Sequence, residues 1–309
     1  MDMQKTEKKW EVKEFAEQLK GMLAESLPGY CLEVQKVRKN NSVLLTGIAV
    51  REPDSSVSPV VYLEGLYARY LDGESLQTLK DAFLNTLQNS KLPEEYKTGQ
   101  LLDFAAVRDR VCLRLVNAAA NKERLEDFPH RLFHDLAVTY YVRLWDGSAS
   151  VTVNEKLMQQ WGTDEGELYA LALRNTREAL GLSVVPLSDA IGRILGQPGE
   201  NGCGMPDVPD CPLYLAGAAS GHDGACAILY DDILEEFSLR MGADFYILPS
   251  SRHETLFLPV GPQPLPCDAG DLLEMVKSVN RTKVAPEDVL SDSVYLYHRQ
   301  EKRLEMLEG

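Results

Sequence analysis

Apolar residues along the chain switch repeatedly between helical and strand spacing. They first recur at steps of three and four over 12–23, which predicts an amphipathic helix. Two runs with the alternation of strands follow at 30–37 and 43–50. The Asn40-Asn41 pair between them tolerates positive φ, so these runs predict a β-hairpin.

The middle of the chain continues this mixture of strands and helices. A strand is expected to pass into a helix near Leu66, and Asp146-Gly147 is a strong hairpin signal between two apolar runs. Asn154 and Thr163 are the expected N-caps of two further helices. The other expected elements are a helix over 76–87, strands over 110–117, 135–144 and 150–153, and a short helix from Ser188.

The last hundred residues predict the order β-β-α-β-β-α-β-β. The expected elements are strands at 213–219 and 224–230, a helix at 231–242, strands at 244–248 and 255–260, a helix at 268–280 and a final hairpin from 293. Helices are interleaved with hairpins rather than with single strands. The pattern therefore predicts an α+β fold with mainly antiparallel sheets.

A Pro- and Gly-rich stretch over 197–212 is the best internal boundary. It predicts an N-terminal α+β region at 1–200 and a C-terminal region at 212–309. One continuous domain is the alternative, because 309 residues suffice for either arrangement.

The charge balance excludes some functions. With 32 Lys and Arg against 47 Asp and Glu, the net charge is −15, which disfavours direct binding to nucleic acid. Such a surface suits a basic protein partner, although acidity also serves solubility alone. No apolar run approaches the ~20 residues of a membrane span, and no secretory h-region follows the first lysines. A cytoplasmic protein with reduced cysteines is expected, with Cys112 and Cys226 as small core residues.

Several stretches resemble a bacterial family known only as a domain of unknown function. They are "NNSVLLTGIAV", "LVNAAANKERLEDFPHRLFHDLAVTYYVRL", "DFYILPSSRHE" and "VAPEDVLSDSVYLYHR", which together span roughly Trp10 to Arg299. The run "TVNEKLMQQWGTDEGELYALALRNTREAL" is more distantly similar to the YtpQ-like family, which is also uncharacterised. The resemblance implies an α+β fold and a cytoplasmic bacterial protein, and it assigns no activity, cofactor or catalytic residue.

Motifs for metal, phosphate and covalent chemistry are missing. His130 and His134 have the spacing of a metal pair, but Arg131 replaces the glutamate of H-E-x-x-H. In an extended segment the two histidines would lie ~13 Å apart, too far to share a metal. Cys203 and Cys211 lack the close spacing of a zinc pair. No phosphate loop or nucleophile elbow occurs. The sequence therefore predicts no metal, no cofactor and no catalytic residue.

One polar cluster, "PSSRHE" at 249–254, lies between two apolar runs. Its candidate binding residues are Ser250, Ser251, Arg252 and His253. In an extended segment Ser251 and His253 share one side, so a Ser–His pair is conceivable. The structural alternative is a hairpin bend in which serine side chains bond turn amides. His130 and Arg131 complete the set of candidate binding residues.

Three functional hypotheses follow. The leading one is a non-enzymatic protein that binds a macromolecule or regulates one through its acidic surface. The first alternative is a small-molecule enzyme or sensor with a pocket near the Pro249–Glu254 turn. The second alternative is a structural subunit of a homo-oligomer, although the sequence does not give the oligomeric state.

Overall fold

The structure is a computed structural model that describes residues 9–53, 59–89, 100–144, 149–194, 213–261 and 269–307. Contacts divide the chain into two compact units, Met1–Leu101 and Leu102–Gly309. Elements from both predicted regions, 1–200 and 212–309, belong to the second unit. The loop predicted as the boundary between those regions lies outside the described residues.

The first unit packs helices against a three-stranded antiparallel sheet of order β1-β2-β3. The hairpin of β1 and β2 is confirmed, and Asn41 at its turn has φ 56°. Phe15 and Phe83, on two of the helices, are both fully buried in the core of this unit. Its elements are α1 Val12–Ser26, β1 Cys31–Arg38, η1 Asn40–Ser42, β2 Leu44–Arg51, β3 Val60–Tyr62, α2 Glu64–Leu71 and α3 Leu76–Asn89.

The second unit begins with an antiparallel sheet built around β6, which pairs with β4 on one side and with β5 and β7 on the other. Helix α8 packs along the outer edge of β4, where the Thr176 hydroxyl accepts a 2.7 Å hydrogen bond from the Leu113 amide. The short helix η2 Gln100–Leu102 spans the boundary between the units. The elements here are α5 Phe104–Val107, η3 Arg108–Arg110, β4 Val111–Asn117, α6 Lys122–Leu125, β5 His130–Phe133, β6 Leu136–Leu144, β7 Ala149–Thr152, α7 Glu155–Trp161 and α8 Glu165–Leu180.

The caps of α7 and α8 follow local sequence with one difference. Asn154 accepts from the Leu157 amide, as its capping role predicts. The N-cap of α8 is Asp164, which accepts from the Glu167 amide, and Thr163 was wrong by one position. The Thr163 hydroxyl instead donates to the Glu167 carboxylate at 2.8 Å.

The second sheet of this unit has six antiparallel strands in the order β13-β12-β10-β11-β9-β8. Its hairpins β10–β11 and β12–β13 both agree with the expected elements. The elements are β8 Ser183–Pro186, α9 Leu187–Ile194, β9 Tyr214–Gly217, η4 Gly224–Leu229, α10 Asp231–Met241, β10 Phe245–Leu248, β11 Glu254–Pro259, α11 Ala269–Thr282, β12 Val294–His298 and β13 Arg303–Leu307.

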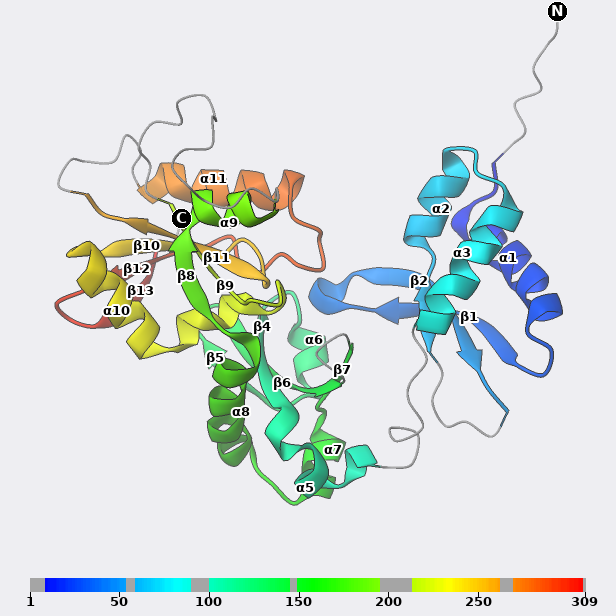
Figure 1. Ribbon diagram of the computed structural model, residues 1–309, viewed down its shortest axis with the longest axis horizontal. Coiled ribbons are helices and arrows are strands. Elements are labelled where there is room, and N and C mark those ends of the chain that lie inside the picture. The colour runs from blue at the N-terminus through cyan, green and yellow to red at the C-terminus, as the bar shows by residue number, and fades with distance from the viewer. Residues whose placement is uncertain are drawn as a thin grey trace, which may run out of the picture. The chain divides into compact units, whose positions relative to one another are not determined.

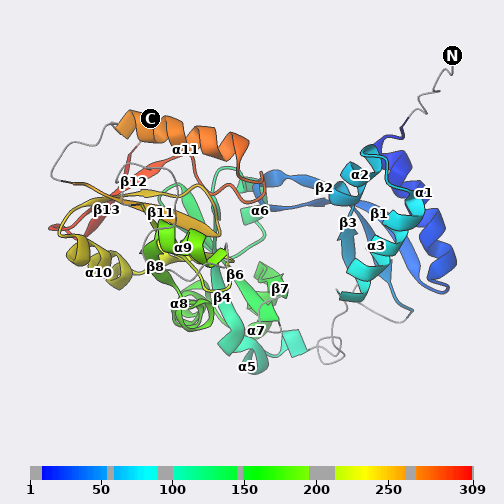
Figure 2. The same ribbon diagram turned by 45° about the horizontal axis from the view of Figure 1, so that its top comes forward.

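Helices cover both faces of the six-stranded sheet, with α11 on one side and α10 on the other (Figures 1 and 2). Leu248 and Leu258 face α11 and pack against Leu272. On the opposite face, Phe237 of α10 meets Phe245 edge to face, with ring centroids 4.8 Å apart. This burial on both faces explains why the strands lack a simple apolar–polar alternation.

The predicted strand at 224–230 was wrong, because this segment forms the 3-10 helix η4. The amides of Gly224 and Ala225 donate to the carbonyls of His253 and Arg252. These two bonds take the place of the regular strand-to-strand hydrogen bonds that a β-strand would make. The observed C-terminal order is therefore β-η-α-β-β-α-β-β. The predicted turn at Asp146-Gly147 lies outside the described residues.

All strand pairings in the described ranges are antiparallel, and helices are interleaved between them, which confirms the α+β fold. Within the same ranges, the helices are too short or too polar to cross a bilayer. Cys112 and Cys226 are fully buried, as expected, and burial raises the pKa of the Cys112 thiol to about 11.

Candidate functional site

The predicted bend between β10 and β11 is held by a second segment of the chain. Pro249 has no amide to extend the ladder, and the Ser251 hydroxyl accepts a 3.0 Å bond from the His253 amide. The backbone then pairs with residues 288–291. Ser250 accepts from the Leu290 amide, and the Arg252 amide donates to the Asp288 carbonyl. The bend is therefore a fixed platform rather than a loose turn.

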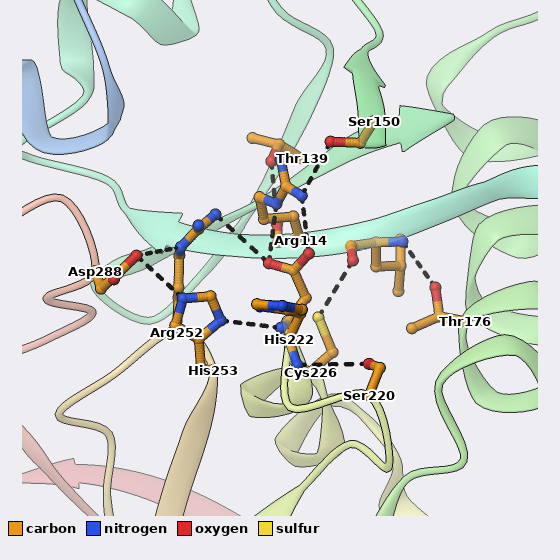
Figure 3. A network of polar contacts seen from close by, with 12 residues as sticks. Arg114, Thr139, Ser150, Thr176, Ser220, His222, Cys226, Arg252, His253 and Asp288 are labelled. Carbon is orange, nitrogen blue, oxygen red and sulfur yellow. Dashed lines mark hydrogen bonds and ion pairs between the residues drawn. The ribbon is translucent and has the colours of Figure 1, made fainter. Parts of the chain in front are cut away.

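Two arginines converge on the carboxylate of Asp223 at this platform. Arg114, from the middle of β4, donates to both Asp223 oxygens at 2.9 and 2.8 Å. The Arg252 Nη1 lies 3.6 Å from the same carboxylate, and its Nε donates to Asp288 at 2.7 Å. Figure 3 shows these side chains in one network of polar contacts, in which Arg252 and His253 are both joined to Asp288. We call this set the Asp223 network, and its members are Arg114, Asp223, Arg252, His253 and Asp288.

Asp223 is charged although it is buried. Its side chain is only 5% exposed, and that burial alone would raise its pKa. The positive charge and hydrogen bonds of Arg114, followed by the charge of Arg252, outweigh the burial and hold the pKa below its usual value. Asp223 in turn raises the pKa of Arg114. The two residues therefore form an ion pair in which the carboxylate is buried and one edge of the guanidinium reaches solvent.

Both ring nitrogens of His253 are engaged. The Asp223 amide donates to Nδ1 at 3.4 Å, so the ring proton lies on Nε2, which faces Asp288 at 3.1 Å. The exposed ring of His222 packs edge to face on His253, with centroids 5.2 Å apart. The conceivable Ser251–His253 pair does not form between side chains, because the Ser251 hydroxyl contacts the backbone of His253.

Close backbone packing positions Asp223 in the network. Asp223 adopts the left-handed conformation with φ 55°, which aspartate tolerates better than most residues. The next residue, Gly224, touches backbone on two sides. A Cβ there would lie 2.3 Å from the Ala218 nitrogen and 2.6 Å from the His253 oxygen. Only glycine fits at this position without displacing the platform.

The candidate residues His130 and Arg131 are neighbours on β5, so they lie on opposite faces of the sheet formed by β4, β6, β5 and β7. His130 is in register with Thr139, which is in register with Arg114, so all three share a face. The Nδ1 atom of His130 contacts the Phe128 carbonyl at 2.9 Å. Because β6 lies between β5 and β4, the backbones of His130 and Arg114 are about 10 Å apart.

Arg131 points to the other face. There it pairs with Glu165 at 2.9 Å and stacks over the Tyr169 ring. The structure therefore brings Arg252 and His253 into the network, keeps His130 on the adjoining strands and excludes Arg131.

Sequence reasoning missed Arg114, Asp223 and Asp288. Arg114 carried a usable signal, because a charged residue within a buried strand requires a partner. Asp223 was part of an ordinary turn in "SGHDG", and Asp288 follows a helix without any distinguishing pattern. No signal in the sequence connects these carboxylates with Arg252.

In the part of the chain that the structure describes, no three His, Cys, Asp or Glu side chains lie close enough together to hold a metal ion. Cys203 and Cys211, considered above for zinc, lie outside that part.

The chain matches one family model over residues 12–299, that of a family of unknown function, DUF5688. No curated protein and no solved structure matches it. The comparisons thus support the resemblance to a family of unknown function and show no link to the YtpQ-like family.

Proposed function

The chain belongs to the DUF5688 family, and we propose that it acts by binding a ligand rather than by catalysing a reaction. The ligand site is the exposed side of the Asp223 network at the Pro249–His253 bend. The non-enzymatic character comes from the leading expectation, a macromolecule-binding or regulatory protein, and the site comes from the first alternative, a small-molecule enzyme or sensor with a pocket near that bend.

The observation that carries the proposal is that both ring nitrogens of His253 already make polar contacts within the protein. A general base must offer a free nitrogen to the proton that it removes. Here Nδ1 accepts from the Asp223 amide and Nε2 faces Asp288, so proton transfer would break one of these bonds. The nearest serine in sequence, Ser251, has its hydroxyl bonded to backbone. This arrangement favours recognition over acid–base chemistry.

The exposure of the network supports the same function. The side chains of Arg252, Arg114 and His253 are 23%, 20% and 18% exposed, so their edges reach solvent while their carboxylate partners hold them in place. Donors that are already fixed lose little conformational entropy when a ligand binds. Guanidinium edges of this kind recognise oxyanions.

The test is thermal unfolding of the full chain with a panel of organic acids, sugar phosphates and inorganic anions at constant ionic strength. At least one anion should raise the Tm by several degrees at about 100 times its Kd, relative to chloride. NMR of the solution after incubation should recover that anion unchanged. The proposal is wrong if no anion raises the Tm, or if the active anion is consumed.

A pair of variants assigns the effect to the network. Arg252→Gln should lose the anion-dependent rise in its own Tm, because it removes the charge that faces solvent. Arg177→Gln should keep the rise, since Arg177 forms an exposed pair with Asp232 on other elements. An equal response in both variants would place the anion elsewhere.

A further inference from the structure

Arg124, in α6, is a half-buried arginine beside the network. Its guanidinium lies 5.0 Å from the centre of the Phe128 ring. Among the described residues, no carboxylate lies within ion-pair distance of it. Arg114 and Arg252 differ, because each already has an aspartate partner. The guanidinium donors of Arg124 are therefore available to an anion from solution, and its partial burial strengthens such a contact.

Packing places α6 on the same face as the network. Leu125, the neighbour of Arg124, packs against Val116 and Ala137. Val116 lies two residues beyond Arg114 on β4, so the two side chains share a face about 7 Å apart along the strand.

A hydrogen bond also ties this region to the platform. The Asn117 side chain donates to the Leu290 carbonyl at 3.0 Å, two residues beyond Asp288.

Arg124 and the Asp223 network together carry unequal numbers of charges. Arg114, Arg124 and Arg252 are three positive side chains, and Asp223 and Asp288 are two carboxylates. Burial, together with the positive charges of Arg114 and Arg252, lowers the pKa of Arg124. Within this set of five side chains one positive charge, that of Arg124, lacks a carboxylate partner, and a singly charged anion would match it.

We propose that Arg124 binds the carboxylate group of the ligand, with the exposed edge of Arg252 as its neighbour. The planar fork of an arginine matches a carboxylate with two parallel hydrogen bonds. A carboxylate carries one negative charge, which matches the one arginine that lacks a carboxylate partner, whereas a phosphate dianion carries more negative charge than this arginine can balance. This inference rests on the proposed function and names the chemical class of its ligand.

The experiment is titration calorimetry of the full chain with acetate, succinate and a short peptide that ends in a free carboxylate. The same peptide with an amidated C-terminus is the control for the peptide source, and inorganic phosphate is the control for charge. Wild type should bind a carboxylate more tightly than phosphate. A preference for succinate indicates a small organic acid, and binding of the peptide acid but not its amide indicates a chain terminus.

Three variants test the role of Arg124. Arg124→Gln should weaken carboxylate binding at least about 10-fold, as expected for a charge-assisted hydrogen bond. Arg124→Lys should weaken it less, because lysine keeps the charge but lacks the fork. Lys122→Gln, an exposed change on the same helix, should bind as wild type. If Arg124→Gln does not fold, the lysine variant decides.

The outcomes separate this inference from the proposed function. Wild-type affinity in Arg124→Gln or Arg124→Lys, with binding lost in Arg252→Gln, overturns the role of Arg124 and leaves the binding function intact. Tighter binding of phosphate than of every carboxylate overturns the ligand class alone. Failure of every anion to bind wild type overturns both.

Discussion

Asp223 combines a buried charge with a left-handed backbone, and each of these has an energetic cost. Its side chain is 5% exposed and its φ is 55°. An isolated carboxylate in such a place would become neutral. The two hydrogen bonds from Arg114 keep it ionised, and the Gly224 and Ala225 amides anchor the following turn on His253 and Arg252. The residue is therefore stable only where these segments are assembled.

Replacement of Asp223 by asparagine should destabilise the protein by about 2–4 kcal/mol at pH 7, because it leaves Arg114 without its counter-charge. Asparagine tolerates the same backbone conformation, so the change isolates the charge. The value is below that of a fully buried pair, since Arg114 is 20% exposed. Urea unfolding measures it. Asp232→Asn, in an exposed ion pair, should change stability by no more than about 0.5 kcal/mol.

The same variant has a pH dependence of known sign. The pKa of Asp223 is lower in the folded chain than its ordinary value. Its stabilising contribution is then complete above the unfolded pKa of about 3.9 and is lost as the pH falls through the folded pKa. The stability difference between wild type and Asp223→Asn should be constant from pH 7 to about 5 and shrink below about pH 4. A difference that stays constant down to pH 3 would contradict the ion-pair assignment.

At the scale of elements, the short helix η4 joins the two sheets of the second unit. The Gly224 amide donates to the carbonyl of His253, directly before β11, and the Cys226 thiol donates to the Leu113 carbonyl of β4. Strand β4 also supplies Arg114, the residue that follows Leu113. Because Asp223 directly precedes η4 and its arginine partners come from β4 and from the bend before β11, the network is intact only when η4 packs against both sheets.

Gly224→Ala should therefore disturb the site through its packing. The added methyl group would meet backbone at 2.3 Å, which no side-chain rotation relieves, so a loss of about 3 kcal/mol is expected. Hydrogen exchange at 249–254 should accelerate as the His253 carbonyl is displaced.

Gly221→Ala is the matched control. Unlike Gly224, it has a positive φ, 71°, but nothing lies within 4 Å of an added Cβ, so the backbone strain alone should cost about 1 kcal/mol. A loss at Gly224 no larger than the loss at Gly221 would contradict the steric clash, because Gly224 has no positive φ that could account for it.

At the scale of the whole molecule, the chain has two units with separate cores. The core of Met1–Leu101 contains Phe15 and Phe83, whereas that of Leu102–Gly309 contains Leu248 and Leu272. The Asp223 network belongs entirely to the second unit. A basic protein partner, expected from the net charge of −15, stays a prediction for the molecule as a whole.

Phe15→Ala should destabilise the first unit by about 3–5 kcal/mol, because the side chain is fully buried. Hydrogen exchange of the full chain should accelerate in 12–89 and stay unchanged in 111–307. Leu248→Ala should produce the converse pattern. Loss of protection in both units from either substitution would mean that the chain unfolds as one cooperative body.

The sequence by itself determined the elements and the fold class. Periodicity and turn residues act over a few positions, so the hairpins β1–β2 and β10–β11 and the long helices agree with expectation. The same local logic explains Ser251, whose hydroxyl bonds a turn amide. The apolar run of η4 resembled a strand because spacing alone does not reveal which partner its amides will find.

Only the tertiary structure decided the site. Arg114 and Asp223 are separated by 109 positions, and Arg252 and Asp288 by 36. Their pairing depends on which faces of two sheets meet at η4, and no local pattern encodes that choice. The polar bend at 249–254 was visible in the sequence from the start. Its partners were not, because a buried charge is recognised only when the residues that neutralise it are brought together in space.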